Sequence, residues 1–182
     1  MQELVSVGMD ILSYAGCNPH EVVGKPECCG HCGGRDFHRH GTYPRGLCEV
    51  SRVLRILVAR FLCMICLKTT SRLPNFAISY RLLALALVAR YFVSTPEERS
   101  GFSHEELLRR YARRWASWCP ELLAQIGAGL GRIRARDPCG VWKELGRRTG
   151  SHTAVNSKLI TVFGLSLLGR YRIHARSHRA NL

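Results

Sequence analysis

Two Cys-x-x-Cys pairs are the residues of this chain best suited to chemistry. They are Cys29 with Cys32 and Cys63 with Cys66, and positions 33 to 62 separate them. A two-residue gap lets one tight turn direct both sulfurs at a single ion, and four thiolates satisfy a tetrahedral Zn²⁺. We therefore predict one structural zinc ion, held by these four cysteines.

The same stretch offers other ligand sets. Cys28 could replace Cys29, although Cys29 alone leaves a two-residue gap to Cys32. A histidine could also replace a cysteine, the candidates being His31, His38 and His40. We interpret the remaining cysteines as ordinary small apolar residues, namely Cys17, Cys48, Cys119 and Cys139.

Redox chemistry and disulfide bonding fit the cysteines less well than metal binding. A single Cys-x-x-Cys is typical of a redox pair, whereas two pairs with strand-like sequence between them indicate a metal site. Disulfides need an oxidising compartment. Residues Met1 to Tyr14 have neither the basic start nor the sustained apolar core of a secretory signal. We therefore expect a cytoplasmic protein.

Positive charge is the second signal in the sequence. The 182 residues contain 27 Lys and Arg against 13 Asp and Glu, a formal net charge of +14. No acid occurs from Val50 to Pro96, a stretch that contains Arg52, Arg55, Arg60, Lys68, Arg72, Arg81 and Arg90. Such a surplus attracts polyanions, and the planar arginine fork suits phosphate. A codon bias toward arginine would explain part of this surplus but not the missing acids.

A membrane span is excluded by length. Arg81 and Arg90 bracket only eight residues, far short of the ~20 apolar residues that a spanning helix needs. We therefore expect a soluble protein without a membrane partner.

The order of the segments predicts an α+β fold, in which a small β zinc ribbon precedes a helical domain. We divide the chain into a lead-in segment at 1–25, a zinc ribbon at 26–76, a helical domain at 77–168 and a basic tail at 169–182. The lead-in suggests a short helix over Glu3 to Tyr14. The ribbon suggests a strand over Arg35 to His40, a turn over Gly41 to Gly46 and a second strand over Val50 to Phe61.

The helical domain begins with a segment from Tyr80 to Val93 that is apolar on every side, as expected of a buried central helix. Further helices are predicted over Glu121 to Arg136, Val141 to Arg148 and His152 to Phe163, the last capped by Ser151. The break at 94–101 is longer than the turn of a helix-turn-helix, which disfavours that motif.

The segment from Ser103 to Trp118 is the best-defined amphipathic helix of the sequence. Ser103 and Glu106 match a capping box, and Cys119-Pro120 is expected to end the helix. At 100° per residue, one arc is apolar and the opposite arc carries Arg109, Arg110, Arg113 and Arg114. Four like charges on one face suggest contact with a phosphate backbone, the alternative being a merely solvated face.

The cysteine-containing stretch resembles the N-terminal zinc ribbon of bacterial insertion-sequence transposases. The resemblance rests on Cys29 to Gly34, His40 to Tyr43 with Arg45, and Arg60 to Pro74. Those ribbons commonly have Arg-Arg-Phe-x-Cys-x-x-Cys followed by a Thr-Phe-Ser-like run; here Ala59 replaces the first Arg and Thr70 the Phe. The match covers about residues 28 to 80. The overall plan is closest to an uncharacterised family of bacterial, mobile-element-associated zinc-ribbon proteins.

The resemblance implies a zinc-dependent DNA-binding segment without the transposase reaction. Strand transfer needs an acidic triad that holds two metal ions. This chain has three aspartates, Asp10, Asp36 and Asp137, and the last two lie in turn-like sequence. Serine-hydrolase, zinc-protease and phosphate-loop signatures are also missing. We therefore predict a protein that is not an enzyme and has no small-molecule substrate.

Double-stranded DNA is the partner that we predict from these features. The predicted phosphate contacts are Arg52, Arg55 and Arg60 near the ribbon, and Arg109, Arg110, Arg113 and Arg114 on the helix. The function would be that of a DNA-binding protein derived from a transposase or accessory to a mobile element. The alternative is a zinc-ribbon adaptor that binds protein or RNA.

Overall fold

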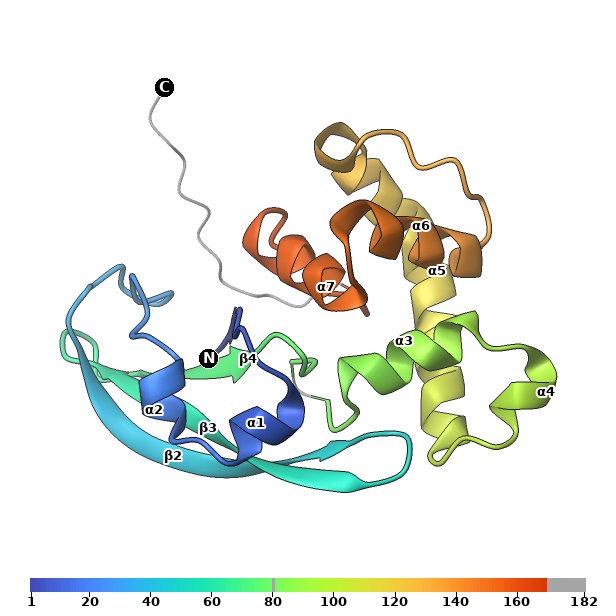
Figure 1. The fold of residues 1–182 in the computed structure, drawn as a ribbon. Helices are drawn as coiled ribbons and strands as arrows, with labels where there is room; N and C mark the ends of the chain where they lie inside the picture. Colours follow the sequence, from blue (N-terminus) through green and yellow to red (C-terminus); the bar gives the residue numbers. More distant parts are fainter. Residues whose placement is uncertain (80, 170–182) are drawn as a thin grey trace.

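The fold of the chain, as a computed structural model, is described for residues 1–79 and 81–169 and is of the mixed α+β kind (Figure 1). Of the predicted basic tail at 169–182, all but Gly169 lies outside the described residues. In the described part the strands are β1 (Gln2–Val5), β2 (Phe37–Cys48), β3 (Val53–Cys63) and β4 (Thr69–Pro74). The helices there are α1 (Ile11–Ala15), α2 (Pro19–Val22), α3 (Leu85–Val93), α4 (Pro96–Arg99), α5 (Glu105–Leu130), α6 (Pro138–Thr149) and α7 (His152–Thr161).

The strands of the described residues form one sheet in the order β1-β4-β3-β2. Strands β2 and β3 make a long antiparallel hairpin, with Phe37 opposite Cys63 at its base. Strand β4 runs antiparallel to β3, and β1 runs parallel to β4. Helices α1 and α2 lie against β3 (Figure 1). The sheet therefore positions the second cysteine pair at the end of β3, with Cys63 as the last residue of the strand.

Residues 1–25 contribute to the core of the sheet. Their apolar side chains Leu4, Ile11 and Tyr14 are buried in one cluster with Ile56 and Phe61 of β3. The predicted helix over 3–14 is wrong in its first part, because Gln2–Val5 pairs with β4 as a strand. Local sequence does not reveal this pairing, since its partner lies about 70 residues away.

The hairpin also turns at a different place from the one predicted. The turn lies at 49–52, where the Glu49 amide donates to the Arg52 carbonyl at 2.8 Å. The expected turn over 41–46 is wrong because β2 continues through it. Gly41, at φ +78°, instead lies in a register shift between Arg39 and Thr42. A single left-handed residue there bends the strand as a β-bulge without reversing it.

Helix α3 is the centre of the helical part, as the sequence predicted, although it begins only at Leu85. It contacts α5, α6 and α7. A cluster of three aromatic rings joins α3, α5 and α6. The Phe92 and Trp115 rings stack at 5.9 Å, and the Trp142 ring meets both edge-on. Aromatic pairs of this geometry add to the stability that burial alone gives.

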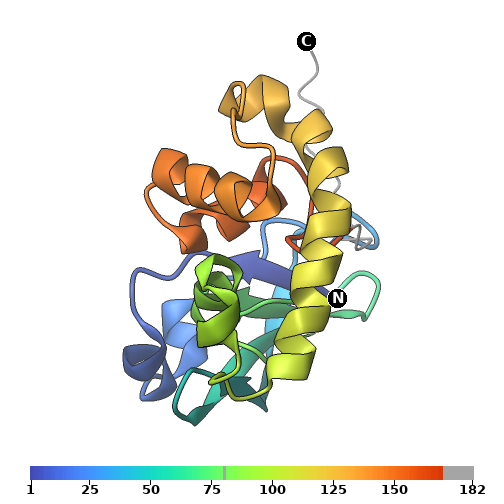
Figure 2. The ribbon, with the colours of Figure 1, turned by 90° about the vertical axis from the view of Figure 1, so that its right-hand side faces the viewer.

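Helix α5 is much longer than predicted and runs along one side of the molecule (Figure 2). The predicted stop at Cys119-Pro120 is wrong, because Pro120 lies inside the helix. Proline leaves the carbonyl four residues earlier without its donor. Here that carbonyl belongs to Ala116, and both residues are exposed, so water can satisfy it. The buried Leu122 and Ile126 continue the apolar face beyond the proline.

The predicted capping box of Ser103 and Glu106 is also wrong. His104, in a left-handed conformation at φ +64°, precedes the helix and makes no side-chain cap hydrogen bond. The same chemistry occurs eight residues earlier, where Thr95 and Glu98 cap α4 reciprocally. The predicted cap of α7 is confirmed, since Ser151 accepts from the Ala154 amide at 3.0 Å.

Two buried polar side chains join the sheet to the helical part. Arg45 of β2 is 8% exposed and donates to the carbonyls of Ile78, at 2.6 Å, and Arg81. Asn156 of α7 donates to the carbonyls of Asn75 and Ala77, at 3.3 and 3.5 Å. Buried polar groups need such partners. Both side chains therefore fix the segment that connects β4 to α3.

No helix among the described residues is both long and apolar enough to cross a membrane.

Leu85 tests the assignment of α3 as the central helix. Its side chain is 1% exposed, as the sequence predicted for this position. We expect Leu85→Asp to lower the free energy of unfolding by at least about 3 kcal/mol, because it buries an unpaired charge. The matched control is Ala86→Asp, at the adjacent exposed position of α3. Thermal melting of both variants measures the effect, and equal melting temperatures would contradict it.

Candidate metal centre

The four cysteines predicted as ligands lie together at the base of the β2–β3 hairpin. Their sulfurs are all within 4.8 Å of one another. The Cys29 and Cys66 sulfurs are 3.6 Å apart, as are those of Cys32 and Cys63. Four sulfurs bound tetrahedrally at about 2.3 Å from one ion lie about 3.8 Å apart. These distances fit a shared metal ion and are too long for disulfide bonds, which need about 2.05 Å.

The two Cys-x-x-Cys turns are built in the same way. In each, the amide of the first cysteine donates to the carbonyl five residues later, from Cys29 to Gly34 at 2.7 Å and from Cys63 to Lys68 at 3.0 Å. In each, the amide four residues after the first cysteine donates back to its carbonyl, from Gly33 at 2.7 Å and from Leu67 at 2.9 Å. The backbone therefore directs both sulfurs of each turn the same way.

The same position of each turn has a left-handed backbone. Gly33 lies at φ +76° in the first turn and Leu67 at φ +56° in the second. Glycine adopts this conformation without cost, whereas an L-residue with a Cβ loses roughly 1–2 kcal/mol. The Leu67 side chain is 67% exposed and gains little from packing. The sulfur geometry thus holds Leu67 in a strained conformation.

The alternative ligands considered from the sequence lie outside this cluster. Among the described residues, the group close enough to share a metal comprises Cys29, Cys32, Cys63 and Cys66 and includes neither Cys28 nor a histidine. The side chains of His31, His38 and His40 are exposed. Of the other cysteines, Cys119 is buried, which raises its thiol pKa to about 11.

The electrostatics of the cluster favour a cation. Amides of Cys66 and Ile65 that point at the sulfur lower the pKa of Cys63 to about 7. The Gly34 amide lowers the pKa of Cys32, but burial and the three neighbouring sulfurs outweigh it and raise this pKa to about 12. Several thiolates this close together repel one another, and a bound divalent ion removes that repulsion.

The seven predicted phosphate-binding arginines have different surroundings. Arg52 pairs with Glu49 at 2.9 Å, and Arg60 donates to the Thr69 hydroxyl at 3.5 Å. On α5, Arg109 pairs with Glu105, and Arg114 donates to the Leu168 carbonyl. The remaining three are exposed, and no hydrogen bond or ion pair within the described residues engages them: Arg55, Arg110 and Arg113.

The structure adds three arginines that the sequence analysis missed. Arg132, Arg134 and Arg136 lie in the connection between α5 and α6 and line an open cavity of 560 Å³. A helix over 121–136 was predicted there, which would have distributed these side chains around its axis. The strict alternation of arginine with Ile133 and Ala135 was the signal of a non-helical segment.

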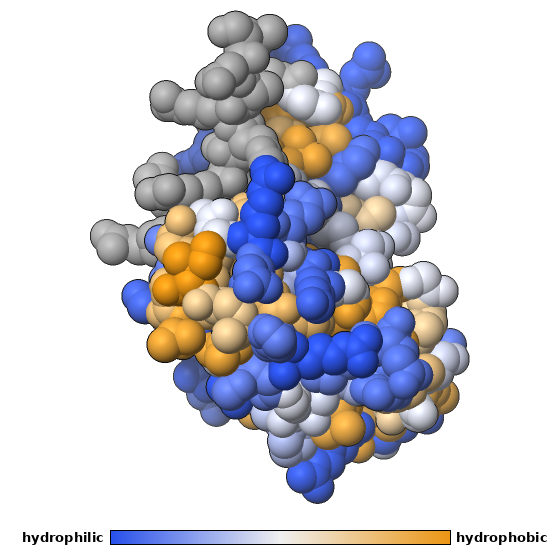
Figure 3. Space-filling view, turned by 90° about the vertical axis from the view of Figure 1, so that its left-hand side faces the viewer, coloured by the Kyte–Doolittle hydropathy of each residue, from blue (hydrophilic) through white to orange (hydrophobic). Residues whose placement is uncertain are grey.

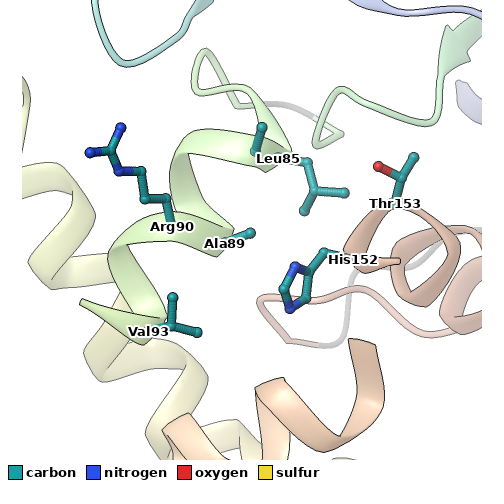
Figure 4. Close-up of a pocket in the computed structure, with 7 residues that line it drawn as sticks. Leu85, Ala89, Arg90, Val93, His152 and Thr153 are labelled. Atoms are coloured by element: carbon teal, nitrogen blue, oxygen red, sulfur yellow. The ribbon is translucent and has the colours of Figure 1, made fainter. Parts of the chain in front are cut away.

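A second cavity, of 330 Å³, lies between α3 and the start of α7 (Figure 4). His152 stacks on Trp142 at 4.6 Å, and its pKa is lowered by burial. Arg90 points away from His152 in Figure 4, and the Ala89 side chain lies between them. The lining residues include no carboxylate, and Thr153 supplies the one side-chain hydroxyl among them.

Comparisons with protein-family models, curated proteins and solved structures gave no match to this chain.

The first test of the centre separates Cys29 from Cys28. We expect the wild-type protein and Cys28→Ser to carry one Zn²⁺ per chain by elemental analysis, and Cys29→Ser to lose it. Removal of zinc by a chelator should disorder the sheet. The three tryptophans lie in the helical core, so their emission shows independently whether the helices survive. Zinc retained in Cys29→Ser, or lost in Cys28→Ser, would contradict the ligand set.

The second test concerns the strain at Leu67. In the presence of Zn²⁺, we expect Leu67→Gly to be about 1 kcal/mol more stable than Leu67→Ala, because alanine keeps the Cβ that the left-handed backbone disfavours. Both variants remove the same exposed side chain, so packing cancels in the comparison. Denaturant unfolding measures the difference. An alanine variant as stable as the glycine variant would show that the turn relaxes.

Proposed function

We propose that this chain is a zinc-ribbon protein that binds double-stranded DNA and has no catalytic activity. The observation that carries the proposal is the set of four cysteine sulfurs within 4.8 Å, at the base of a hairpin and beside strongly basic sequence. Four thiolates fill the coordination of Zn²⁺ and leave no position for a substrate or a reactive water. The zinc therefore stabilises the fold and takes no part in a reaction.

In this proposal the chain has a ribbon unit followed by a helical unit. The cysteine turns and the hairpin between them form the ribbon, at 26–76, and the helices from α3 onward form the second unit, at 77–168. The transposase-like ribbon sequence suggests a relic or an accessory of a bacterial mobile element, which would work at the nucleoid.

The DNA-binding surface of the proposal uses the arginines that the fold leaves available. Arg55 lies on β3, and Arg110 and Arg113 lie one turn apart on α5. Like charges at such spacing repel each other, and a phosphate backbone offsets that repulsion. By contrast, Arg109 pairs with Glu105 and Arg114 donates to the Leu168 carbonyl, so these two guanidinium groups already have partners within the fold.

A second candidate function is that of a protein-binding adaptor. Apolar side chains at the second cysteine turn are open to solvent: Met64 is 40% exposed, Ile65 66% and Leu67 67%. Figure 3 faces the side where the loop between β3 and β4 lies and shows hydrophobic side chains gathered among hydrophilic ones. Exposed apolar groups rimmed by polar ones are typical of protein-interaction sites.

Salt dependence tests the DNA-binding proposal. We expect tight binding of a mixed-sequence duplex at low salt, with an affinity that falls steeply as salt increases, because each neutralised phosphate releases counterions. The double variant Arg110→Gln/Arg113→Gln should reduce the slope of log K against log salt by about 2. Fluorescence anisotropy at several salt concentrations measures this slope.

The matched control is Lys143→Gln/Arg147→Gln, which removes two exposed charges from α6. Equal slopes for the two double variants would mean that net charge, and not the α5 face, determines binding. Failure of the wild-type protein to bind duplex, single strand or RNA at low salt would refute the DNA-binding function and favour the adaptor.

A further inference from the structure

The connection between α5 and α6 carries an arginine strap, which we define as residues 131–136. Exposure alternates along it: Arg132, Arg134 and Arg136 are exposed, while Ile133 and Ala135 are half-buried against the helical core. Two residues of chain span at most about 7 Å. The three guanidinium groups therefore lie close enough for each to reach one of several consecutive phosphates on a nucleic-acid strand.

The strap is fixed in place by two side chains of α6. Glu144 accepts from the amides of Arg134 and Ala135, at 3.0 and 3.1 Å. Arg148 donates to the carbonyls of Leu130 and Arg132, both at 2.6 Å, and pairs with Glu144 at 2.6 Å. Charge-assisted hydrogen bonds to consecutive backbone groups hold a segment in one conformation. The arginines are thus presented on an anchored backbone.

The start of the strap requires glycine. Gly131 lies at φ +72°, and a Cβ there would be 3.2 Å from Nη1 of Arg148. The residue therefore allows both the left-handed turn out of α5 and the close approach of the anchoring guanidinium.

The strap leaves its own charge without compensation. Two acids lie beside it. The Glu144 carboxylate binds backbone amides of the strap and Arg148, and Asp137, the residue after the strap, accepts from the Gly140 amide at 2.8 Å. The pKa of Glu144 is lowered, first by the Ala135 amide and also by Arg148, so this side chain is a carboxylate at neutral pH. Within the described residues, no ion pair engages Arg132, Arg134 or Arg136.

The strap ends against α5, at the side that faces the helical core. The Trp115 indole donates to the Pro138 carbonyl at 2.9 Å, directly after the strap. Ala112 and Ala116 of α5 line one cavity together with Asp137 and Pro138. The lining of this cavity includes Arg99 and Asp137 but not Arg113, so the strap is a contact surface separate from the arginines of α5.

We propose that the arginine strap is a binding site for consecutive phosphates along one strand of a nucleic acid. This inference rests on the proposed DNA-binding function and names a second contact surface for it. Planar guanidinium forks bind phosphate oxygens well, and backbone contacts of this kind position a protein without reading sequence. The same chemistry would accept a free polyphosphate, so the tests include both sources of phosphate.

The first experiment removes the three arginines of the strap. For the variant Arg132→Gln/Arg134→Gln/Arg136→Gln, we expect the slope of log K against log salt for duplex binding to fall in magnitude by about 2.7. This is about 0.9 for each lost phosphate contact. The control Lys143→Gln/Arg147→Gln/Lys158→Gln removes the same charge from exposed positions of α6 and α7. Equal changes in the two triple variants would overturn the inference.

The second experiment keeps the three arginines and removes the hydrogen bonds from Glu144 that hold the backbone of the strap. Glu144→Ala raises the net charge by one, so simple attraction predicts tighter binding of the duplex. Loss of the anchored geometry predicts binding several-fold weaker than in the wild type. The control is Glu97→Ala, an equal charge change at an exposed position of α4. Tighter binding in both variants would contradict a preorganised site. Tryptophan emission verifies that both variants keep the helical core.

Titration with inorganic tripolyphosphate at low salt, by calorimetry, distinguishes the sources of phosphate. We expect 1:1 binding that the strap variant loses and the triple control keeps. Strap-dependent binding of tripolyphosphate without any duplex binding would refute the DNA-binding function and leave the strap as a site for free polyphosphate. Duplex binding that is indifferent to the strap, together with no tripolyphosphate binding, would overturn the inference alone. Binding of neither probe would overturn both.

Discussion

The convergence of four cysteine sulfurs is the constraint on which the sheet depends. Two backbone turns with the same hydrogen bonds direct these sulfurs at one point, and the Met64 amide joins the turns by donating to the Asp36 carbonyl at 3.0 Å. Thiolates so close repel one another unless a cation lies among them. A metal bound there would close the base of the hairpin, where Phe37 faces Cys63 and the register of β2 against β3 begins. Its binding free energy would then contribute to the folding free energy of the sheet.

The helical part depends on a different constraint, the burial of an apolar centre, and polar contacts connect it to the sheet. Arg45 loses most of its hydration, and burial lowers its pKa. Its hydrogen bonds to the carbonyls of Ile78 and Arg81 offset part of that cost. Ile160 of α7 belongs to the apolar cluster of the sheet. The arginine face of α5 and the strap are thus set on a rigid helical frame attached to the sheet.

The cysteine cluster could be predicted from the sequence because its information is local. Ligand spacing and turn chemistry lie within a few residues of each cysteine, and the structure brings the four predicted sulfurs together. The α+β class and the buried helix around Leu85 were predicted for a similar reason, since segment order and apolar composition can be read along the chain.

Other features were hidden because they depend on distant partners or on exposure. The β1–β4 pairing joins residues about 70 positions apart. Pro120 is tolerated inside α5 because the carbonyl it leaves unpaired faces solvent, and no sequence pattern shows on which side a carbonyl will lie. Gly41 and Pro44 resemble a turn, yet the long register of β2 against β3 overrides them. Glu144 and Arg148 of α6 determine the conformation of the arginine strap, although the alternation of arginine with Ile133 and Ala135 already indicated a non-helical segment.

We propose that one metal ion bound by four cysteine sulfurs holds the sheet together. X-ray absorption spectroscopy at the zinc edge of the purified protein tests this proposal, because it counts and identifies the atoms bound to the metal. We predict a single shell of four sulfurs at about 2.3 Å. A shell that contains nitrogen or oxygen at 2.0–2.1 Å would contradict the four-cysteine site and reopen the choice of ligands.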